Sequence, residues 1–177
     1  MQNNQPSIHK QLLDLASQLG AALKERGHLL ALAESCTGGM ASQYITAIAG
    51  SSGWFDRSFI TYSNAAKMDM LGINPIVLEK FGAVSEETTR EMAKGALHNS
   101  AATIAASISG IAGPDGGTAS NPVGTVCFGI ARSPSYRSDS HLHAPWTTTQ
   151  HLTGNREAIR LQSVKFIFEQ LLISATT

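Results

Sequence analysis

The sequence predicts a layered α/β domain built on a mixed, mostly parallel sheet. Segments in which apolar residues recur at helical spacing alternate along the chain with short apolar or small-residue runs, which is typical of helices packed on a sheet. The last two predicted strands, 123–131 and 147–152, have no helix between them, so one antiparallel neighbour is expected. With 177 residues and no internal repeat or linker, the chain is expected to form a single domain over 1–177.

Helix and strand signals alternate through the N-terminal half. The first helix is indicated by Ile8, Leu12, Leu15 and Leu19, and Gly27 is a natural stop for it. The elements expected here are a helix over 7–26, a strand over 29–33, a helix over 38–48, a strand over 54–62, a helix over 65–71 and a short helix opening at Pro75.

The C-terminal half continues the alternation. Ser85 is placed to cap a helix that runs to about Asn99, with Glu86 and Glu87 in its first turn. The elements expected after it are a strand over 101–109, a glycine-rich loop over 110–117, a strand over 123–131, a loop over 133–140, a strand over 147–152 and an amphipathic helix over 155–173.

The composition excludes several classes of protein. Thirteen basic and thirteen acidic residues leave no net charge, so no nucleic-acid partner is expected. Two cysteines cannot form a disulfide framework, and the polar start of the chain resembles no secretory signal, so a cytoplasmic location is expected. The uncharged stretch 95–114 is too polar to span a membrane. The small, apolar helix over 87–99 is compatible with a homodimer or a higher homo-oligomer.

The segment Glu34-Ser35-Cys36-Thr37-Gly38-Gly39 joins a predicted strand to a predicted helix and carries two potential nucleophiles. Backbone N–H groups at a helix start suit a phosphate or a developing oxyanion, and the backbone of Thr37, Gly38 and Gly39 is expected to supply them. Neighbours in an extended strand point to opposite faces, so only one of Ser35 and Cys36 is expected to face a ligand. The residues themselves leave the choice between them open.

A serine nucleophile needs a base, and no histidine stands in a motif that would supply one. The better partners lie in the segment that runs from Tyr62 to Lys67. If a helix begins near Ser63, Lys67 lies one turn on, and a partly buried lysine loses its proton more easily. A serine–lysine–tyrosine arrangement is one alternative to the histidine triad. A solvated helix lysine is the other interpretation of Lys67.

A second glycine-rich loop follows the strand over 101–109 and is a candidate ligand-binding segment. Its glycines permit close approach of a ligand, and its one acid can cap a turn or bind a ribose or a cationic group. The residues expected to bind substrate here are Ser109, Gly110, Gly113, Asp115 and Gly116. Neither a P-loop nor a Rossmann fingerprint is present, and no metal site is expected because the histidines and cysteines lack zinc-ligand spacing. Cys127 lies in an apolar strand and is expected to be an inert core residue.

Arg156 stands in the first turn of the last predicted helix, where a cation is unfavourable unless an anion binds beside it. Arginine recognises phosphate in a bidentate manner, so Arg156 is expected to bind an anionic group of the substrate. Arg160, one turn on, is expected to be structural or on the surface.

These motifs together resemble the CinA C-terminal domain family across nearly the whole chain. The matching segments are Ala-Glu-Ser-Cys-Thr-Gly-Gly at 33–39, Ile-Ala-Gly-Ser-Ser at 48–52, Thr-Tyr-Ser-Asn at 61–64 with Lys67, Gly-Ala-Val-Ser at 82–85, Ser-Ile-Ser-Gly-Ile-Ala-Gly-Pro-Asp-Gly-Gly at 107–117, Pro-Val-Gly-Thr-Val at 122–126 and Gly-Asn-Arg-Glu-Ala-Ile-Arg at 154–160. The segment 133–146 matches no motif of the family.

The resemblance implies a three-layer α/β/α sandwich that hydrolyses the carboxamide of nicotinamide mononucleotide to nicotinate mononucleotide and ammonia. It implies that Ser35 is the nucleophile, that Tyr62 and Lys67 activate it, and that the two glycine loops and Arg156 bind the nucleotide. No cofactor is expected. A non-catalytic nucleotide-binding module, and more distantly a cysteine hydrolase built on Cys36, are the alternatives.

Overall fold

A five-stranded mixed sheet forms the centre of the molecule in the computed structural model, which describes residues 6–134 and 144–176. The strand order is β2-β1-β3-β4-β5. Strand β1 pairs in parallel with β2 and β3, whereas β4 pairs antiparallel with β3 and β5, so β4 runs against the other four. The strands are β1 (Leu30–Glu34), β2 (Phe55–Ile60), β3 (Ile104–Gly110), β4 (Thr125–Arg132) and β5 (Trp146–His151).

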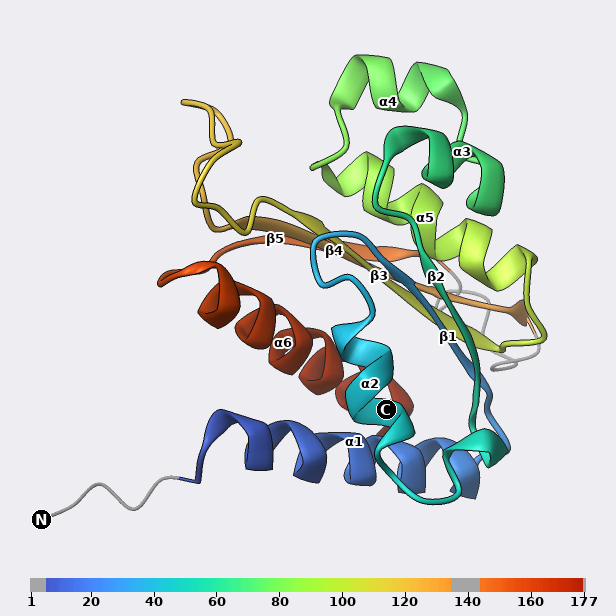
Figure 1. Cartoon of the computed structure of the whole chain (residues 1–177). Coiled ribbons are helices and arrows are strands. Elements are labelled where there is room, and N and C mark those ends of the chain that lie inside the picture. The colour runs from blue at the N-terminus through green and yellow to red at the C-terminus, as the bar shows by residue number, and fades with distance from the viewer. Residues whose placement is uncertain (1–5, 135–143, 177) are drawn as a thin grey trace, which may run out of the picture.

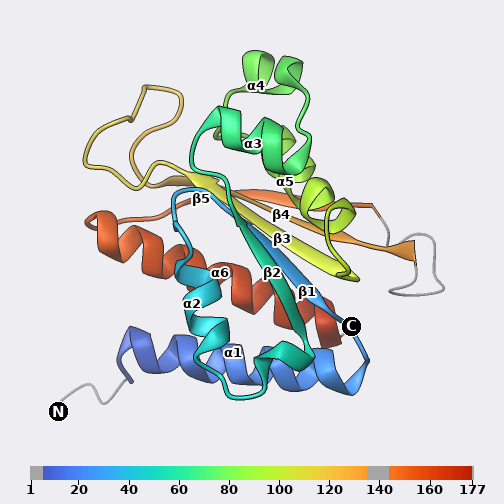
Figure 2. The same cartoon turned by 45° about the vertical axis from the view of Figure 1, so that its right-hand side comes forward.

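Helices cover both faces of the sheet and give the expected α/β/α layering (Figure 1). Helices α1, α2 and α6 lie on one face, and α3, α4 and α5 lie on the other, an arrangement that the turned view in Figure 2 repeats. The helices are α1 (Ile8–Glu25), α2 (Met40–Thr46), α3 (Asn64–Leu71), α4 (Pro75–Phe81), α5 (Glu86–His98) and α6 (Arg156–Thr176), and a 3₁₀ turn, η1, spans Ser51–Gly53.

Each face of the sheet buries its own apolar cluster. Strand β1 divides its side chains between them: Leu30 and Leu32 join the cluster under α1 and α6, and Ala31 and Ala33 join the cluster under α3 and α5. This division follows from the alternation of side chains along a strand. A central strand that is covered on both faces is mostly apolar, which explains the apolar run that precedes Glu34 in β1.

Most of the predicted elements are present with shifted ends. Serine side chains cap α1, α3 and α5, since Ser7, Ser63 and Ser85 each accept a hydrogen bond from a backbone N–H three residues on. Strand β3 begins three residues later than expected because 101–103 connect it to α5. Most of the predicted loop 133–140 lies outside the described residues.

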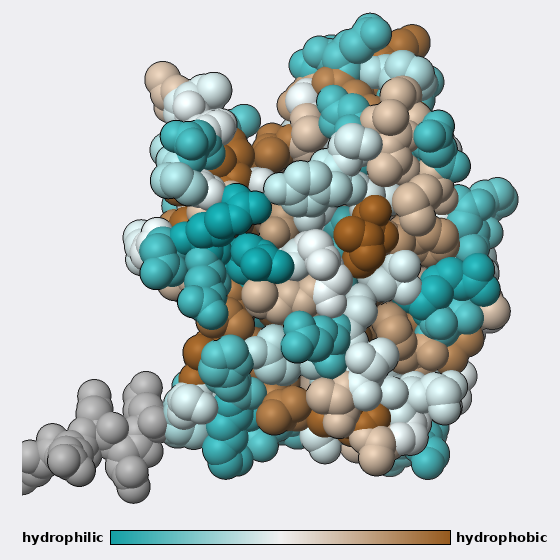
Figure 3. Space-filling view, in the orientation of Figure 1, coloured by the Kyte–Doolittle hydropathy of each residue, from teal (hydrophilic) through white to brown (hydrophobic). Residues whose placement is uncertain are grey.

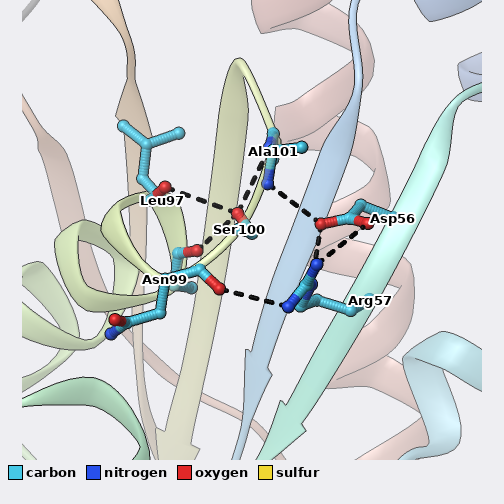
Figure 4. A network of polar contacts seen from close by, with 8 residues as sticks. Asp56, Arg57, Leu97, Asn99, Ser100 and Ala101 are labelled. Atoms are coloured by element: carbon cyan, nitrogen blue, oxygen red, sulfur yellow. Dashed lines mark hydrogen bonds and ion pairs between the residues drawn. The ribbon is translucent and has the colours of Figure 1, made fainter.

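A polar network fixes the beginning of β2 at one end of the sheet (Figure 4). The Asp56 carboxylate accepts a hydrogen bond from the Ala101 N–H at 3.1 Å and from Arg57 Nε at 2.7 Å. Arg57 in turn donates to the Asn99 carbonyl oxygen at 3.4 Å. The network therefore joins β2 to the α5–β3 connection, at the end of the sheet where the parallel strands begin.

The opposite end of the sheet brings the predicted site residues together. Glu34 lies in register with Ile60 of β2 and with Ile108 of β3, so the segments that follow these three parallel strands leave the sheet side by side. Ligands of open α/β sheets bind outside the carboxyl ends of the strands. Ser35, Thr61 and Ser109 therefore meet where this topology favours a site.

Candidate active site

A cavity of about 280 Å³ opens at the carboxyl ends of β1 and β3. It contains most of the residues that the sequence assigns to a site. The lining residues are Ser35, Cys36, Tyr62, Lys67, Ala83, Val84, Ser109, Gly110, Ile111, Ala112, Gly113, Asp115, Gly116 and Arg156. No histidine of the described ranges lines it, and His141 and His143 lie outside those ranges.

Ser35 and Lys67 are in direct contact. Lys67 Nζ lies 3.1 Å from Ser35 Oγ and donates to the Thr61 carbonyl oxygen at 2.8 Å. Helix α3 begins at Asn64, after the Ser63 cap, and carries Lys67 one turn in, as the sequence predicts. The contact joins residues 32 positions apart.

The Lys67 side chain is buried, with 1% of its surface exposed. Burial lowers the pKa of its amine from the ordinary value of 10.5, because a desolvated ammonium is disfavoured, and the nearby Cys36 acts weakly in the other direction. A neutral amine has two N–H donors and one lone pair. One N–H can serve the Thr61 carbonyl while the lone pair accepts the Ser35 hydroxyl proton, so the geometry suits a general base.

Cys36 also lines the cavity, contrary to the expectation that only one of the two neighbours would. The strand ends at Glu34, so its alternation no longer governs residues 35 and 36. Burial raises the pKa of the Cys36 thiol to about 12, because a buried thiolate is disfavoured. The thiol also belongs to the apolar cluster under α1 and α6, and these properties are those of an unreactive cysteine.

Tyr62 lies on the rim of the cavity, with 64% of its surface exposed. Its hydroxyl accepts a hydrogen bond from Arg156 Nη2 at 3.2 Å, and Arg156 Nη1 donates to the Gly113 carbonyl oxygen at 2.7 Å. In the described structure it has no hydrogen bond to Ser35 or Lys67. The expected role of Tyr62 as an activating partner is therefore not supported by its contacts, because its hydroxyl faces Arg156.

Thr37, Gly38 and Gly39, whose backbone is expected to hold an oxyanion, are not among the residues that line the cavity. The Gly38 N–H donates to the Ser35 carbonyl oxygen at 3.1 Å, and the Gly39 N–H donates to the Glu34 carboxylate at 3.0 Å. Both donors are thus used inside the turn.

Glu34 occupies the anion site at the start of α2. Its carboxylate is fully buried and accepts hydrogen bonds from three backbone N–H groups and three hydroxyls. The donors are the N–H groups of Gly39, Ala41 and Ser42 and the hydroxyls of Thr37, Ser42 and Ser58. A protein carboxylate therefore fills the place in which the sequence predicts a ligand's negative charge.

The glycine-rich loop forms the opposite wall of the cavity, as the sequence predicts. Gly110 must be a glycine, because a Cβ there would lie 2.7 Å from the Val126 side chain. Gly113 has φ +76° and leaves no room for a Cβ beside Val123. Ser109 does not present its hydroxyl to the cavity for binding, since the hydroxyl donates to the Ala83 carbonyl oxygen at 2.7 Å and fixes the neighbouring wall.

Two side chains of opposite charge lie at the mouth of the cavity. Arg156 and Asp115 are both exposed at its mouth, and Asp115 has no ion pair or hydrogen bond within the part of the chain that the structure describes. Arg160, which is expected to be structural or on the surface, donates from Nη2 to the Thr37 carbonyl oxygen at 2.7 Å, a contact with the turn after Ser35 that the sequence does not predict. The only signal for it is its spacing of four residues from Arg156, which places both on one side of the helix.

The described ranges offer neither a metal site nor a membrane-crossing helix. Residues 6–134 and 144–176 contain no group of histidine, cysteine and acidic side chains that could hold a metal ion. No helix in these ranges has the length and apolar character needed to cross a membrane. The face shown in Figure 3 mixes hydrophilic and hydrophobic residues without a broad apolar area.

Comparisons with known proteins agree on one family. Residues 12–174 match the family model described as the CinA C-terminal domain. The chain is 51% identical to nicotinamide-nucleotide amidohydrolase PncC of Enterobacter agglomerans. The similarity extends over 163 residues, which are 92% of this chain and 94% of the relative. It is 47% identical to the protein of the same name from Escherichia coli K12, over 91% and 93% of the two chains.

Solved structures give the same result. The competence/damage inducible protein CihA from Agrobacterium tumefaciens superposes with a TM-score of 0.86 at 37% sequence identity, over 97% of this chain and 98% of that one. A CinA superfamily protein from Klebsiella pneumoniae superposes with a TM-score of 0.85 at 33% identity, over 97% and 99%.

Proposed function

This chain belongs to the CinA C-terminal domain family, and from that membership we propose that it hydrolyses the carboxamide of nicotinamide mononucleotide, with Ser35 as nucleophile and Lys67 as base. The products are nicotinate mononucleotide and ammonia. Relatives that are 47–51% identical to this chain are named nicotinamide-nucleotide amidohydrolase, and this supports the reaction. The observation that carries the residue roles is the 3.1 Å contact between Lys67 Nζ and Ser35 Oγ in a buried setting.

The reaction follows from that contact in two stages. Ser35 Oγ attacks the carboxamide carbon while the Lys67 amine takes the hydroxyl proton, and a tetrahedral oxyanion forms. The Lys67 ammonium then protonates the departing nitrogen, which leaves as ammonia and gives an ester on Ser35. Water attacks the ester with Lys67 again as base, and the released proton returns to Ser35 Oγ as nicotinate mononucleotide departs.

The oxyanion needs a donor that the turn does not already use. The Cys36 N–H directly follows the nucleophile. Within the described residues it donates to no backbone carbonyl, although it interacts with its own thiol group. The N–H after the nucleophile is the usual first donor of such a site in hydrolases with a nucleophile at a strand-to-helix turn. We assign the oxyanion to the Cys36 N–H in place of the backbone of Gly38 and Gly39.

The rim supplies the contacts for the rest of the nucleotide. Arg156 is exposed, and its guanidinium suits the phosphate because it can donate in a bidentate manner. Tyr62 shares this position and binds substrate in our assignment, without taking part in proton transfer. Asp115, unpaired among the described residues, is placed to accept hydrogen bonds from ribose hydroxyls or to face the pyridinium charge.

Ammonia release from nicotinamide mononucleotide tests the proposal. The wild-type protein should release it, Ser35→Ala should not, and Cys36→Ala should remain active. Activity that survives Ser35→Ala but not Cys36→Ala would move the nucleophile to Cys36. Saturable nucleotide binding without ammonia release would favour the non-catalytic alternative.

A further inference from the structure

The Arg160 side chain reaches the turn that carries the nucleophile, although it does not line the cavity. Its Nη2 donates to the carbonyl oxygen of Thr37, two residues after Ser35, at 2.7 Å. A Cβ on Gly38 would lie 3.8 Å from the same Nη2. The contact joins α6 to the β1–α2 turn across 123 positions of sequence.

The Arg160 side chain includes a buried donor that lowers the stability of the fold. Its Nε is buried and has no hydrogen-bond partner among the described residues. A buried donor without a partner costs about 1–3 kcal/mol, and more when it is charged. A charged side chain that is kept in such a setting calls for an explanation other than stability.

The positive charge of Arg160 acts on the residue next to the nucleophile. Burial dominates at Cys36 and raises the pKa of its thiol, whereas the Cys36 N–H and, after it, the Arg160 guanidinium oppose that rise. Arg160 therefore favours negative charge at the turn, where the oxyanion of the proposed reaction forms.

The packing of helix α6 sets the direction of the Arg160 side chain. The residues on either side, Ile159 and Leu161, are buried with 1% and 7% of their surfaces exposed, which fixes the rotation of the helix. One turn earlier, Arg156 donates to the Gly113 carbonyl oxygen in the opposite wall. The first turns of α6 thus contact both the nucleophile turn and the glycine-rich loop.

We propose that Arg160 is a positioning residue that holds the Ser35 turn against α6 and supplies positive potential at the site of the oxyanion. This role rests on the proposed function. Displacing a reacting group by about 1 Å through a remote substitution can cost about 10²-fold in rate. Because Arg160 does not line the cavity, its loss should lower kcat and leave KM within about threefold of the wild-type value.

Three substitutions separate charge from geometry. Arg160→Lys keeps the charge, Arg160→Gln keeps a hydrogen-bond donor, and Arg160→Met keeps neither. We expect kcat to fall about 10²-fold in the methionine variant and less in the other two, with lysine restoring the most activity. Arg26→Met is the matched control, because Arg26 also donates to a backbone carbonyl, that of Thr176 at 3.0 Å, and does not line the cavity.

Sulfonylation of Ser35 by phenylmethanesulfonyl fluoride gives a readout that requires no nucleotide. The Oγ–S bond forms as the S–F bond breaks, fluoride leaves, and Lys67 takes the hydroxyl proton. The rate of labelling, measured on folded protein by mass spectrometry, should fall in Arg160→Met and recover in Arg160→Lys, whichever amide the enzyme hydrolyses. If labelling and kcat are unchanged in the methionine variant while only its melting temperature falls, Arg160 is merely structural and the proposal is overturned.

Discussion

Two ionisable side chains close to Ser35 in sequence or in space, those of Glu34 and Lys67, are buried, and they differ in how many hydrogen-bond partners they have. Glu34, with 0% of its surface exposed, receives hydrogen bonds from three N–H groups and three hydroxyls. The amine of Lys67, a residue with 1% of its surface exposed, has hydrogen bonds only with the Ser35 hydroxyl and the Thr61 carbonyl oxygen among the described residues. The carboxylate of Glu34 thus has a full set of hydrogen-bond donors, whereas the amine of Lys67, when neutral, has a lone pair that can accept a proton.

The difference indicates that burial alone does not identify a reactive group. A buried carboxylate with a full set of donors is held as a structural anion at the start of α2. A buried amine with two partners is held where its charged form is costly and its neutral form can accept a proton. We therefore expect that substituting Glu34 lowers the free energy of unfolding and that substituting Lys67 lowers kcat.

The largest expected effect is on turnover. Lys67→Met and Ser35→Ala should each lower kcat by about four orders of magnitude or more, because each removes a member of one catalytic unit. The double variant should be no worse than either single one. Ammonia release under single-turnover conditions measures this, and strictly additive losses would contradict a shared step.

The next effect concerns the fold. Glu34→Gln should lower the free energy of unfolding by about 3–5 kcal/mol, because an amide cannot accept from all the donors that surround the carboxylate. Urea denaturation measures the loss. Asp14→Asn is a control, since Asp14 pairs with Lys10 on the surface and should cost about 1 kcal/mol or less. A Glu34→Gln protein that is as stable as the control would refute the structural assignment.

The charge state of Lys67 should also appear in how stability depends on pH. The folded-state pKa of Lys67 is lowered from 10.5, so as pH falls below that value the unfolded chain binds a proton that the folded chain resists. The wild-type protein therefore loses stability as pH falls from 10.5 towards the folded pKa, and below that pKa the loss is complete. Lys67→Met lacks this contribution. When the free energies of unfolding of the two proteins are measured from pH 11 down to pH 7, the wild-type value should therefore fall relative to that of the variant as the pH is lowered.

The smallest expected effect is at Cys36. Cys36→Ala should keep kcat within about fivefold of the wild-type value, because the thiol is protonated and packed in the apolar cluster. Modification by iodoacetamide should be slow at neutral pH for the same reason. Rapid modification that abolishes ammonia release and is prevented by substrate would instead support a cysteine enzyme.

Local signals in the sequence predict much of the fold and part of the site. The Ser63 cap predicts where α3 begins and that Lys67 lies one turn into it, and the strand-to-helix change predicts where Ser35 lies. These signals leave open whether Lys67 is buried or solvated, which the packing of α3 decides. These features depend on residues that are close in sequence, where propensity and periodicity apply.

The features that the sequence does not predict depend on contacts between distant residues. Glu34 belongs to the same motif as Ser35 in the sequence, but its role depends on where the backbone of α2 and the Ser58 hydroxyl lie. The hydroxyl of Tyr62 faces Arg156, which is 94 positions away. No local pattern fixes such a direction, because it depends on how α6 packs against the sheet.

The central claim, that Lys67 is a neutral base beside Ser35, is tested most directly by observing its amine. The protein labelled with ¹⁵N at lysine Nζ should show one resonance with the shift of a neutral amine at the pH of activity, and this resonance should disappear in Lys67→Met. On titration to lower pH it should move to the ammonium shift, and kcat/KM should fall with the same apparent pKa, below 10.5. A Lys67 resonance that stays at the ammonium shift up to pH 10 in the active enzyme would contradict the account.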